Sequence, residues 1–308
     1  MERRLIASTM DLSGNPARHR RERLVRGAFF GAAAFSVVIS AAIVLSLAGR
    51  AITFALHVDP GSLWTDGWSP RRGQYDLRTI VGGTLVVTAI SMIVATPLGL
   101  GAAIYLSEYA GPRARRRLKP IIEILAGIPS VVMGFFALAV VAPDLVQRLW
   151  SSAPLFTLVA AGIAVGILVT PLVASIAEDA MHAVPSALRE ASVGLGARRM
   201  TTSLRIVFPA ALSGIVAALI VGASRAIGET MVVAMAAGGT GSAQGFAPLE
   251  PGQTMTAAMA SLATGSDQVK GEALTFEALF FVGMLLFLIT FGLNVVSERF
   301  VRRFRNRY

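Results

Sequence analysis

Six long apolar blocks constrain the fold of this 308-residue chain more than any other feature of its sequence. A helix needs about 20 apolar residues to cross the hydrocarbon core of a bilayer. The blocks are continuously apolar, whereas the strands of a membrane β-barrel alternate apolar and polar side chains. We therefore predict an all-α, polytopic membrane helix bundle of about six transmembrane helices. The predicted spans are residues 27–48, 79–106, 120–142, 155–177, 210–237 and 276–297.

Basic residues between the apolar blocks predict the orientation of the chain. Of 28 Lys and Arg residues, 21 lie on one side of the predicted membrane, six on the other and one, Arg225, inside a span. The positive-inside rule then places both termini and the 178–209 loop in the cytoplasm, with basic tails at 1–26 and 298–308. This topology explains the net charge of +10, so we expect no binding to nucleic acid and a multi-pass protein of the plasma (inner) membrane.

The transmembrane domain is predicted to cover residues 27–297, with its longest outer loop at 238–275. That loop is rich in Gly, Ser, Thr and Ala, so we expect it to be irregular, with at most a short helix near Thr254 to Ala263.

The sequence lacks the common motifs of ATPases and metalloenzymes. It has no cysteine, no GxxxxGK[ST] loop to hold nucleotide phosphates and no HExxH, and its three histidines are far apart. We therefore predict a non-catalytic chain without a metal site. Energy for any pumping would have to come from a partner.

The 178–209 loop is long, amphipathic and bounded by prolines. Pro185 suits the start of a helix, and Gly194 and Gly196 permit a sharp turn after it. We predict a helix, a turn and a second helix that lie across the membrane surface and face a soluble partner. An ordinary amphipathic loop on the membrane is the alternative.

This loop resembles the EAA loop of binding-protein-dependent ABC importer permeases. That motif reads EAA, three residues, Gly, nine residues, Ile, one residue and Leu-Pro, and here Ser and Phe replace the third small residue and the Leu. The resemblance implies coupling helices that dock on an ATPase subunit, which binds the ATP, so that this chain holds no cofactor. The matching positions are Glu190, Ala191, Ser192, Gly196, Ile206 and Pro209.

Three further stretches, at 82–110, 123–138 and 224–239, are similar to the phosphate-specific permease pair, and more to its PstC than to its PstA type. The resemblance implies a type I ABC importer permease fold and a path shared with a second, PstA-like permease. It also implies a dimer of ATPase subunits and an external phosphate-binding protein. It further suggests that residues 127–130 break a helix.

Arg225 is the candidate for anion contact, because it lies in an apolar span with Glu229 four residues later on the same helix face. A central Arg costs roughly 2.5–3.5 kcal/mol on insertion scales and usually marks a functional site. Its planar fork can donate two parallel hydrogen bonds to an oxyanion, and Thr230 adds a hydroxyl. The alternative is an ion pair that only fixes helix packing.

Two other functions stay open at this point. One is a permease for another oxyanion, such as sulfate or molybdate, because one Arg serves them all. The other is a membrane scaffold or sensor that binds partners through the 178–209 loop without moving a solute.

Overall fold

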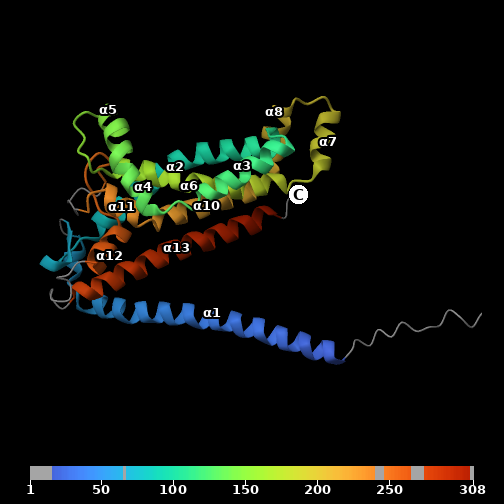
Figure 1. The fold of residues 1–308 in the computed structure, drawn as a ribbon. Helices are drawn as coiled ribbons and strands as arrows, with labels where there is room; N and C mark the ends of the chain where they lie inside the picture. Colours follow the sequence, from blue (N-terminus) through green and yellow to red (C-terminus); the bar gives the residue numbers. More distant parts are fainter. Residues whose placement is uncertain (1–15, 65–66, 240–245, 265–273, 306–308) are drawn as a thin grey trace, which may run out of the picture. The chain divides into compact units, whose positions relative to one another are not determined.

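The computed structural model describes residues 16–64, 67–239, 246–264 and 274–305, and the chain divides into two units after Gly49. The first unit contains most of α1 (Pro16–His57), whose segment Arg21–His57 is long and apolar enough to cross a membrane. The second unit, Arg50–Tyr308, contains the other elements (Figure 1).

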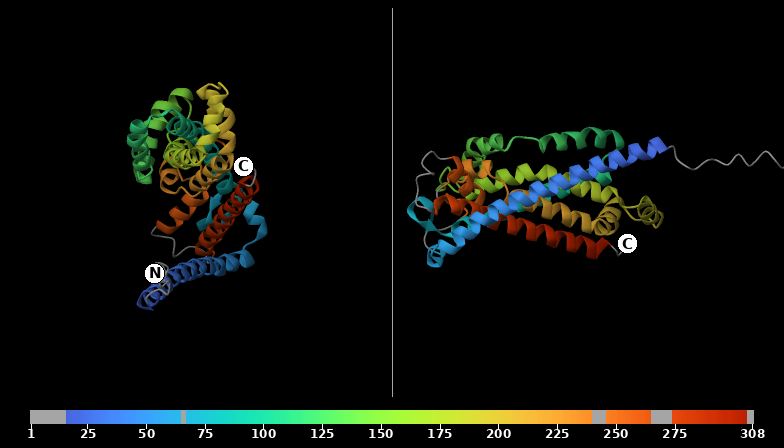
Figure 2. Two further views of the ribbon diagram at one scale, coloured as in Figure 1. Left: turned by 90° about the vertical axis from the view of Figure 1, so that its right-hand side faces the viewer. Right: turned by 90° about the horizontal axis from the view of Figure 1, so that it is seen from below.

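The second unit is a bundle of helices that run side by side (Figure 2). Its long helices are α2 (Leu77–Ile104), α6 (Leu158–His182), α10 (Leu212–Ile227) and α13 (Thr275–Arg305). The shorter helices are η1 (Pro60–Trp64), η2 (Pro70–Arg72), η3 (Tyr105–Tyr109), α3 (Pro112–Leu125), α4 (Ser130–Phe136), η4 (Ala137–Val146), α5 (Gln147–Leu149), α7 (Ser186–Gly194), α8 (Arg199–Thr202), η5 (Ser203–Val207), α9 (Phe208–Ala210), α11 (Met231–Ala236) and α12 (Met255–Thr264).

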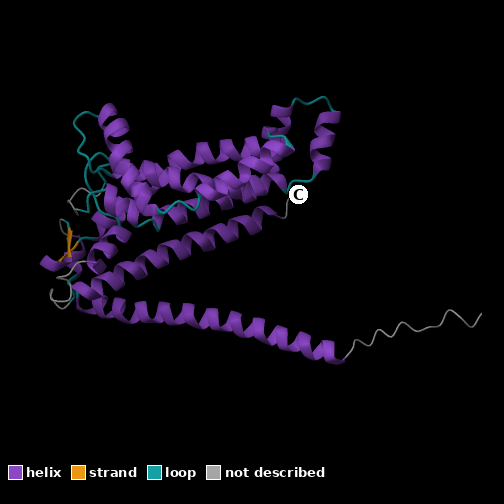
Figure 3. Cartoon of the chain, in the orientation of Figure 1, coloured by secondary structure: helices purple, strands orange, loops and turns teal. Residues whose placement is uncertain are grey.

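The predicted membrane helix bundle is confirmed. Five helices of the described residues are long and apolar enough to span a membrane, and a sixth span results if the pair Arg199–Ala210 and Leu212–Ile227, bent by 72°, is counted as one. Two short antiparallel strands, β1 (Trp68–Ser69) and β2 (Gln74–Tyr75), pair Trp68 with Tyr75 in a connecting segment (Figure 3).

The centre of the bundle is the contact between α2 and α6. Gly162 and Gly166, one turn apart on α6, allow this close approach, because an added Cβ would come within 2.7 Å of Ile90 and Val94 on α2. Small residues four apart let membrane helices pack closely in this way. This core fixes the positions of both helices at the end where α7 and α8 lie, which we call the loop end (Figure 1).

Two of the predicted spans differ from the structure in their helices, and the segment near 120–142 that is long and apolar enough to cross a membrane is Ser130–Leu149. In the span predicted at 120–142, α3 ends at Leu125 and α4 begins at Ser130, because Gly127 and Pro129 oppose a continuous helix. The expected break at 127–130 is therefore present. The span predicted at 210–237 was expected to be continuous, but α10 ends at Ile227 and α11 begins at Met231. Gly228, a weak helix former, lies in this second break.

The described part of the 238–275 loop also differs from the expectation of an irregular outer segment, while residues 240–245 and 265–273 lie outside the described residues. A helix near the expected position is present as α12, but residues 252–258 are buried in the bundle. Gly83 of α2 makes room for them, because an added Cβ there would lie 2.3 Å from the carbonyl oxygen of Gln253. The amide of Met255 then donates to the hydroxyl of Thr84 at 3.0 Å. This segment therefore packs against α2 as part of the bundle.

Candidate functional site

The break between α10 and α11 brings two of the predicted site residues into contact. Nη1 of Arg225, in the last turn of α10, lies 2.5 Å from Oε2 of Glu229, and 45% of the Arg225 side chain is exposed against 2% of Glu229. The two residues were expected on one continuous helix face, yet Glu229 lies beyond the helix end. Arg225 is thus a surface cation of the single chain, held by a buried carboxylate.

The buried α12 segment fixes the break from the other side. The hydroxyl of Thr256 donates to the backbone carbonyl of Glu229 at 2.7 Å. Thr230 is half-buried and donates to the carbonyl of Gly228 at 3.3 Å, so it does not contact Arg225 through this bond. Thr230 and Thr256 are the hydroxyl-bearing residues of an otherwise apolar groove of about 340 Å³ that reaches α13. Thr230 therefore lies beside the ion pair without joining it.

The chemistry of this break suits an oxyanion. Arginine is always charged and has five N–H donors, and among the described residues its hydrogen bond is with Glu229 alone. Glu229 orients the guanidinium and balances its charge, while the exposed donors of Arg225 remain available. Nothing in this arrangement provides a nucleophile or a metal site, and the described residues contain no group of three or more metal-ligating acidic or His side chains.

The predicted helix, turn and helix at 178–209 is also present. Helix α7 ends in a Schellman turn, in which Gly196 has φ +79°. The amide of Gly196 donates to the carbonyl of Val193 at 2.8 Å, and the amide of Ala197 donates to the carbonyl of Ser192 at 3.1 Å. A left-handed residue at this position is usually Gly, which explains the Gly of the motif.

The motif residues of this loop divide into buried and exposed ones. Ser192 is buried, and its hydroxyl lies 2.9 Å from that of Thr202, so the bond joins α7 to α8. Glu190, Ala191, Gly196 and Pro209 are exposed, and Ile206 is half-buried. Three apolar side chains at the tip are strongly exposed, namely Val193 at 60%, Leu195 at 90% and Met200 at 64%. We call Val193, Leu195 and Met200 the apolar tip.

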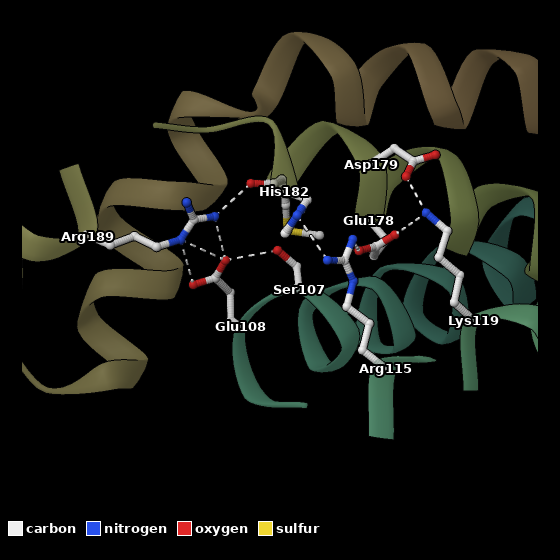
Figure 4. Close-up of polar contacts among 9 residues, drawn as sticks. Ser107, Glu108, Arg115, Lys119, Glu178, Asp179, His182 and Arg189 are labelled. Carbon is white, nitrogen blue, oxygen red and sulfur yellow. Dashed lines mark hydrogen bonds and ion pairs between the residues drawn. The ribbon is translucent and has the colours of Figure 1, made fainter. Parts of the chain in front are cut away.

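The base of this loop is held by an ion pair that was not predicted from the sequence (Figure 4). Nη2 of Arg189, on α7, lies 2.9 Å from Oε1 of Glu108, in the π-helical turn η3 that follows α2. Arg189 also donates to the carbonyls of Met181 and Val184 at the end of α6, at 2.8 and 2.6 Å. One side chain thus links α7, α6 and the end of α2.

A second cluster at the loop end fastens α3 to α6 (Figure 4). The fully buried carboxylate of Glu178 pairs with Arg115 at 2.5 Å and with Lys119 at 2.8 Å. Lys119 also pairs with Asp179, and Arg115 contacts Nε2 of His182 at 2.9 Å. Arg115 and Lys119 stand four residues apart on α3, and Glu178 and His182 stand four apart on α6. That double spacing is the signal by which the sequence could have indicated the cluster.

Burial affects the Lys119 ammonium in this cluster. Burial by itself lowers the pKa of Lys119, but the hydrogen bonds to Asp179 and Glu178 outweigh this effect and raise its pKa above the ordinary value. Lys119 is therefore a cation at neutral pH.

Comparison with known sequences gives a match to one family and to several curated proteins. Residues 95–306 match the family described as "Binding-protein-dependent transport system inner membrane component". The probable ABC transporter permease protein YqgH of Bacillus subtilis is 35% identical over 66% of this chain and 70% of its own length. The phosphate transport system permease protein PstC of Xylella fastidiosa is 30% identical over 86% of this chain and 85% of its own length.

Another PstC protein, PstC 1 of Mycobacterium tuberculosis, is 29% identical over 86% of each chain. Among solved structures, an inward-facing form of the MetNI methionine ABC transporter matches 72% of this chain and 93% of that chain. Its TM-score is 0.56, with 19% sequence identity. At this identity the structural match concerns the fold alone.

Proposed function

The chain belongs to the family of binding-protein-dependent transport system inner membrane components, and we propose that it carries inorganic phosphate across the plasma membrane. As a member of this family it is a non-catalytic, multi-pass permease subunit of an ABC importer. The family resemblance expected from the EAA-like loop is thereby confirmed.

The observation that carries phosphate as the substrate is the exposed Arg225 at a helix break, held by the buried Glu229. A guanidinium is a strong bidentate partner of phosphate oxygens, and a broken helix in the bundle is the usual place for irregular backbone beside a membrane path. The curated relatives that carry the name phosphate transport permease support the same substrate. In this proposal Arg225 and Glu229 line the path, with Thr230 beside them.

The proposed orientation puts the loop end and both termini in the cytoplasm, following the positive-inside rule. Helix α7, the Gly196 turn and α8 then form the coupling loop that docks on one subunit of an ATPase dimer, which binds ATP. The apolar tip suits such a docking surface, because aromatic, apolar and Met side chains are enriched at the centres of interfaces. Glu190 lies exposed beside it.

Two further partners complete the proposal. A second, PstA-like permease would cover the face that bears Arg225, so that the two chains share one path. An external phosphate-binding protein would deliver the anion at the end that bears α5 and α12.

The test is uptake of radiolabelled phosphate by liposomes that contain the assembled importer and internal ATP. Arg225→Gln should lower uptake by about 10- to 100-fold, since a hydrogen bond to a charged group contributes about 1.5–3 kcal/mol. Arg225→Lys should keep part of the activity, because the charge remains but the planar fork is lost. Normal uptake by Arg225→Gln would remove Arg225 from the path.

The same liposomes distinguish the other candidate functions. Excess sulfate or molybdate should leave phosphate uptake unchanged, whereas strong inhibition by either would make that anion the substrate. A scaffold or sensor would bind its partners and give no ATP-dependent uptake of any of the three anions.

A further inference from the structure

We propose that Arg189 and Glu108 are a positioning pair through which the coupling loop moves the end of α2 during transport. The inference rests on the proposed coupling role of the loop and assigns the route by which its movement enters the membrane helices. The pair lies at the base of α7, away from the apolar tip, and joins residues 81 positions apart in the chain.

The geometry of Arg189 makes the connection rigid. Its Nε lies 3.3 and 3.4 Å from the two carboxylate oxygens of Glu108, and its Nη2 lies 2.9 Å from Oε1, which is a forked contact. Two further donors bind the carbonyls of Met181 and Val184. A forked guanidinium has a fixed plane, so α7 cannot turn about this contact without breaking several bonds together.

Burial makes the pair hard to break. Glu108 is 6% exposed and Arg189 is 25% exposed, and the hydroxyl of Ser107 donates a further bond to Glu108 at 2.9 Å. A buried carboxylate without its partner is costly. When the loop moves, the end of α2 should therefore move with it, because separation would leave Glu108 uncompensated.

The backbone at Glu108 departs from a regular α-helix. Tyr105–Tyr109 is a π-helical turn, and such turns inside helices are frequent at functional sites. Helix α2 packs along α6 and also supports the buried α12 segment through Thr84. That segment in turn holds the carbonyl of Glu229. The pair thus begins a chain of contacts that leads from the coupling loop to the break beside Arg225.

The neighbouring Glu178 cluster provides a contrast. It is also buried and ionic and lies at the same end, but its described partners are on α3 and α6 and none is on the coupling loop. If buried charge alone mattered, Glu178 and Glu108 would behave alike. If the link to α7 matters, they should differ in one measurable quantity, the number of phosphate ions imported per ATP hydrolysed.

The experiment measures phosphate uptake, ATP hydrolysis and the yield of assembled complex for the complete importer in liposomes. Glu108→Gln and Arg189→Lys should lower the ratio of phosphate to ATP by about five- to tenfold, in the range of coupling between contacting residues. The double variant should be no worse than the more severe single one, since both break the same link. Glu178→Gln should lower the yield and keep the ratio.

A purely structural role predicts that uptake and hydrolysis fall together with the yield. An unchanged ratio in both single variants, or additive losses in the double variant, would overturn the proposal. Arg189→Lys keeps a positive charge beside Glu108, so it carries the test if Glu108→Gln does not assemble. If the wild-type importer moves sulfate or molybdate instead, the same ratio with that anion tests the pair, and only the substrate is wrong.

Discussion

At the scale of single residues, the most informative contrast is the unequal burial of Arg225 and Glu229. A pair that only stabilised packing would gain little from an exposed guanidinium, because solvent-exposed ion pairs contribute about 0–1 kcal/mol. Here the buried member is the carboxylate and the exposed member is the cation. The arrangement presents a positive group and keeps its countercharge behind it.

A double substitution separates a transport role from a packing role. We expect Arg225→Leu with Glu229→Leu to assemble at near wild-type yield, because an apolar pair of similar volume often replaces an ion pair without loss of stability. Phosphate uptake should nevertheless fall by at least about tenfold. Uptake and complex yield measured on the same membranes distinguish the two roles. An active double-leucine variant would show that the pair serves packing and not transport.

The Lys119 ammonium gives a pH prediction. Because its pKa is raised in the folded chain, its stabilising contribution is fully present below the unfolded value of about 10.4 and is lost as the pH rises through the higher folded value. Lys119→Met should therefore lower the Tm of the detergent-solubilised protein between pH 7 and 9. The difference from wild type should narrow above about pH 10.4, and a difference that grows with pH would contradict this sign.

At the scale of elements, the turn between α7 and α8 depends on the backbone of one glycine. Gly196 has φ +79° with open space around it, so Gly196→Ala should cost about 1–2 kcal/mol through left-handed strain alone. We expect a corresponding loss of ATPase co-purification and uptake, by about tenfold. Gly194→Ala is the matched control, because Gly194 has open space and no positive φ. Equal effects of the two variants would show that the turn geometry is not what matters.

The contact between α2 and the buried segment gives a second element-scale prediction. Gly83→Ala places a Cβ 2.3 Å from the carbonyl oxygen of Gln253, and overpacking of this kind typically costs about 1–3 kcal/mol. Gly101→Ala, on the same helix with nothing within 4 Å, should not lower the stability, because Ala is the better helix former. Thermal unfolding of both variants in detergent measures the difference. A stable Gly83→Ala variant would mean that the 252–258 segment can shift away.

The sequence predicted those features that local residues control. Gly196 and the prolines determine backbone geometry directly, so the turn between α7 and α8 and the break at 127–130 were predictable. The spacing of Arg225 and Glu229 predicted their contact, even though α10 ends between them. The link between Glu108 and Arg189 depends on the packing of distant segments and on a π-helical turn that has no sequence signature. The burial of 252–258 was not predicted, because a Gly- and Thr-rich composition is typical of exposed loops. The segment can be buried because Gly83 of α2 has no side chain and leaves space for it.

At the scale of the whole molecule, the chain is one subunit of an ABC importer. The sequence has no phosphate-binding loop for a nucleotide, and the proposed path needs a second permease. The purified chain alone in liposomes should therefore hydrolyse no ATP and take up no phosphate above the protein-free background. The complete importer, reconstituted in parallel, is the positive control. Robust ATP-driven uptake by the single chain would contradict both the shared path and the need for a separate ATPase.

If the apolar tip docks on an ATPase subunit, as proposed, its exposure has a consequence for how the cell makes this protein. Leu195 is 90% exposed. Each chain produced without an ATPase subunit would therefore expose an apolar surface to water, and exposed apolar surfaces promote aggregation. Excess copies would then be targets for chaperones and proteases. Balanced synthesis of the two subunits would protect the chain, so the dosage of the ATPase should set how much permease survives.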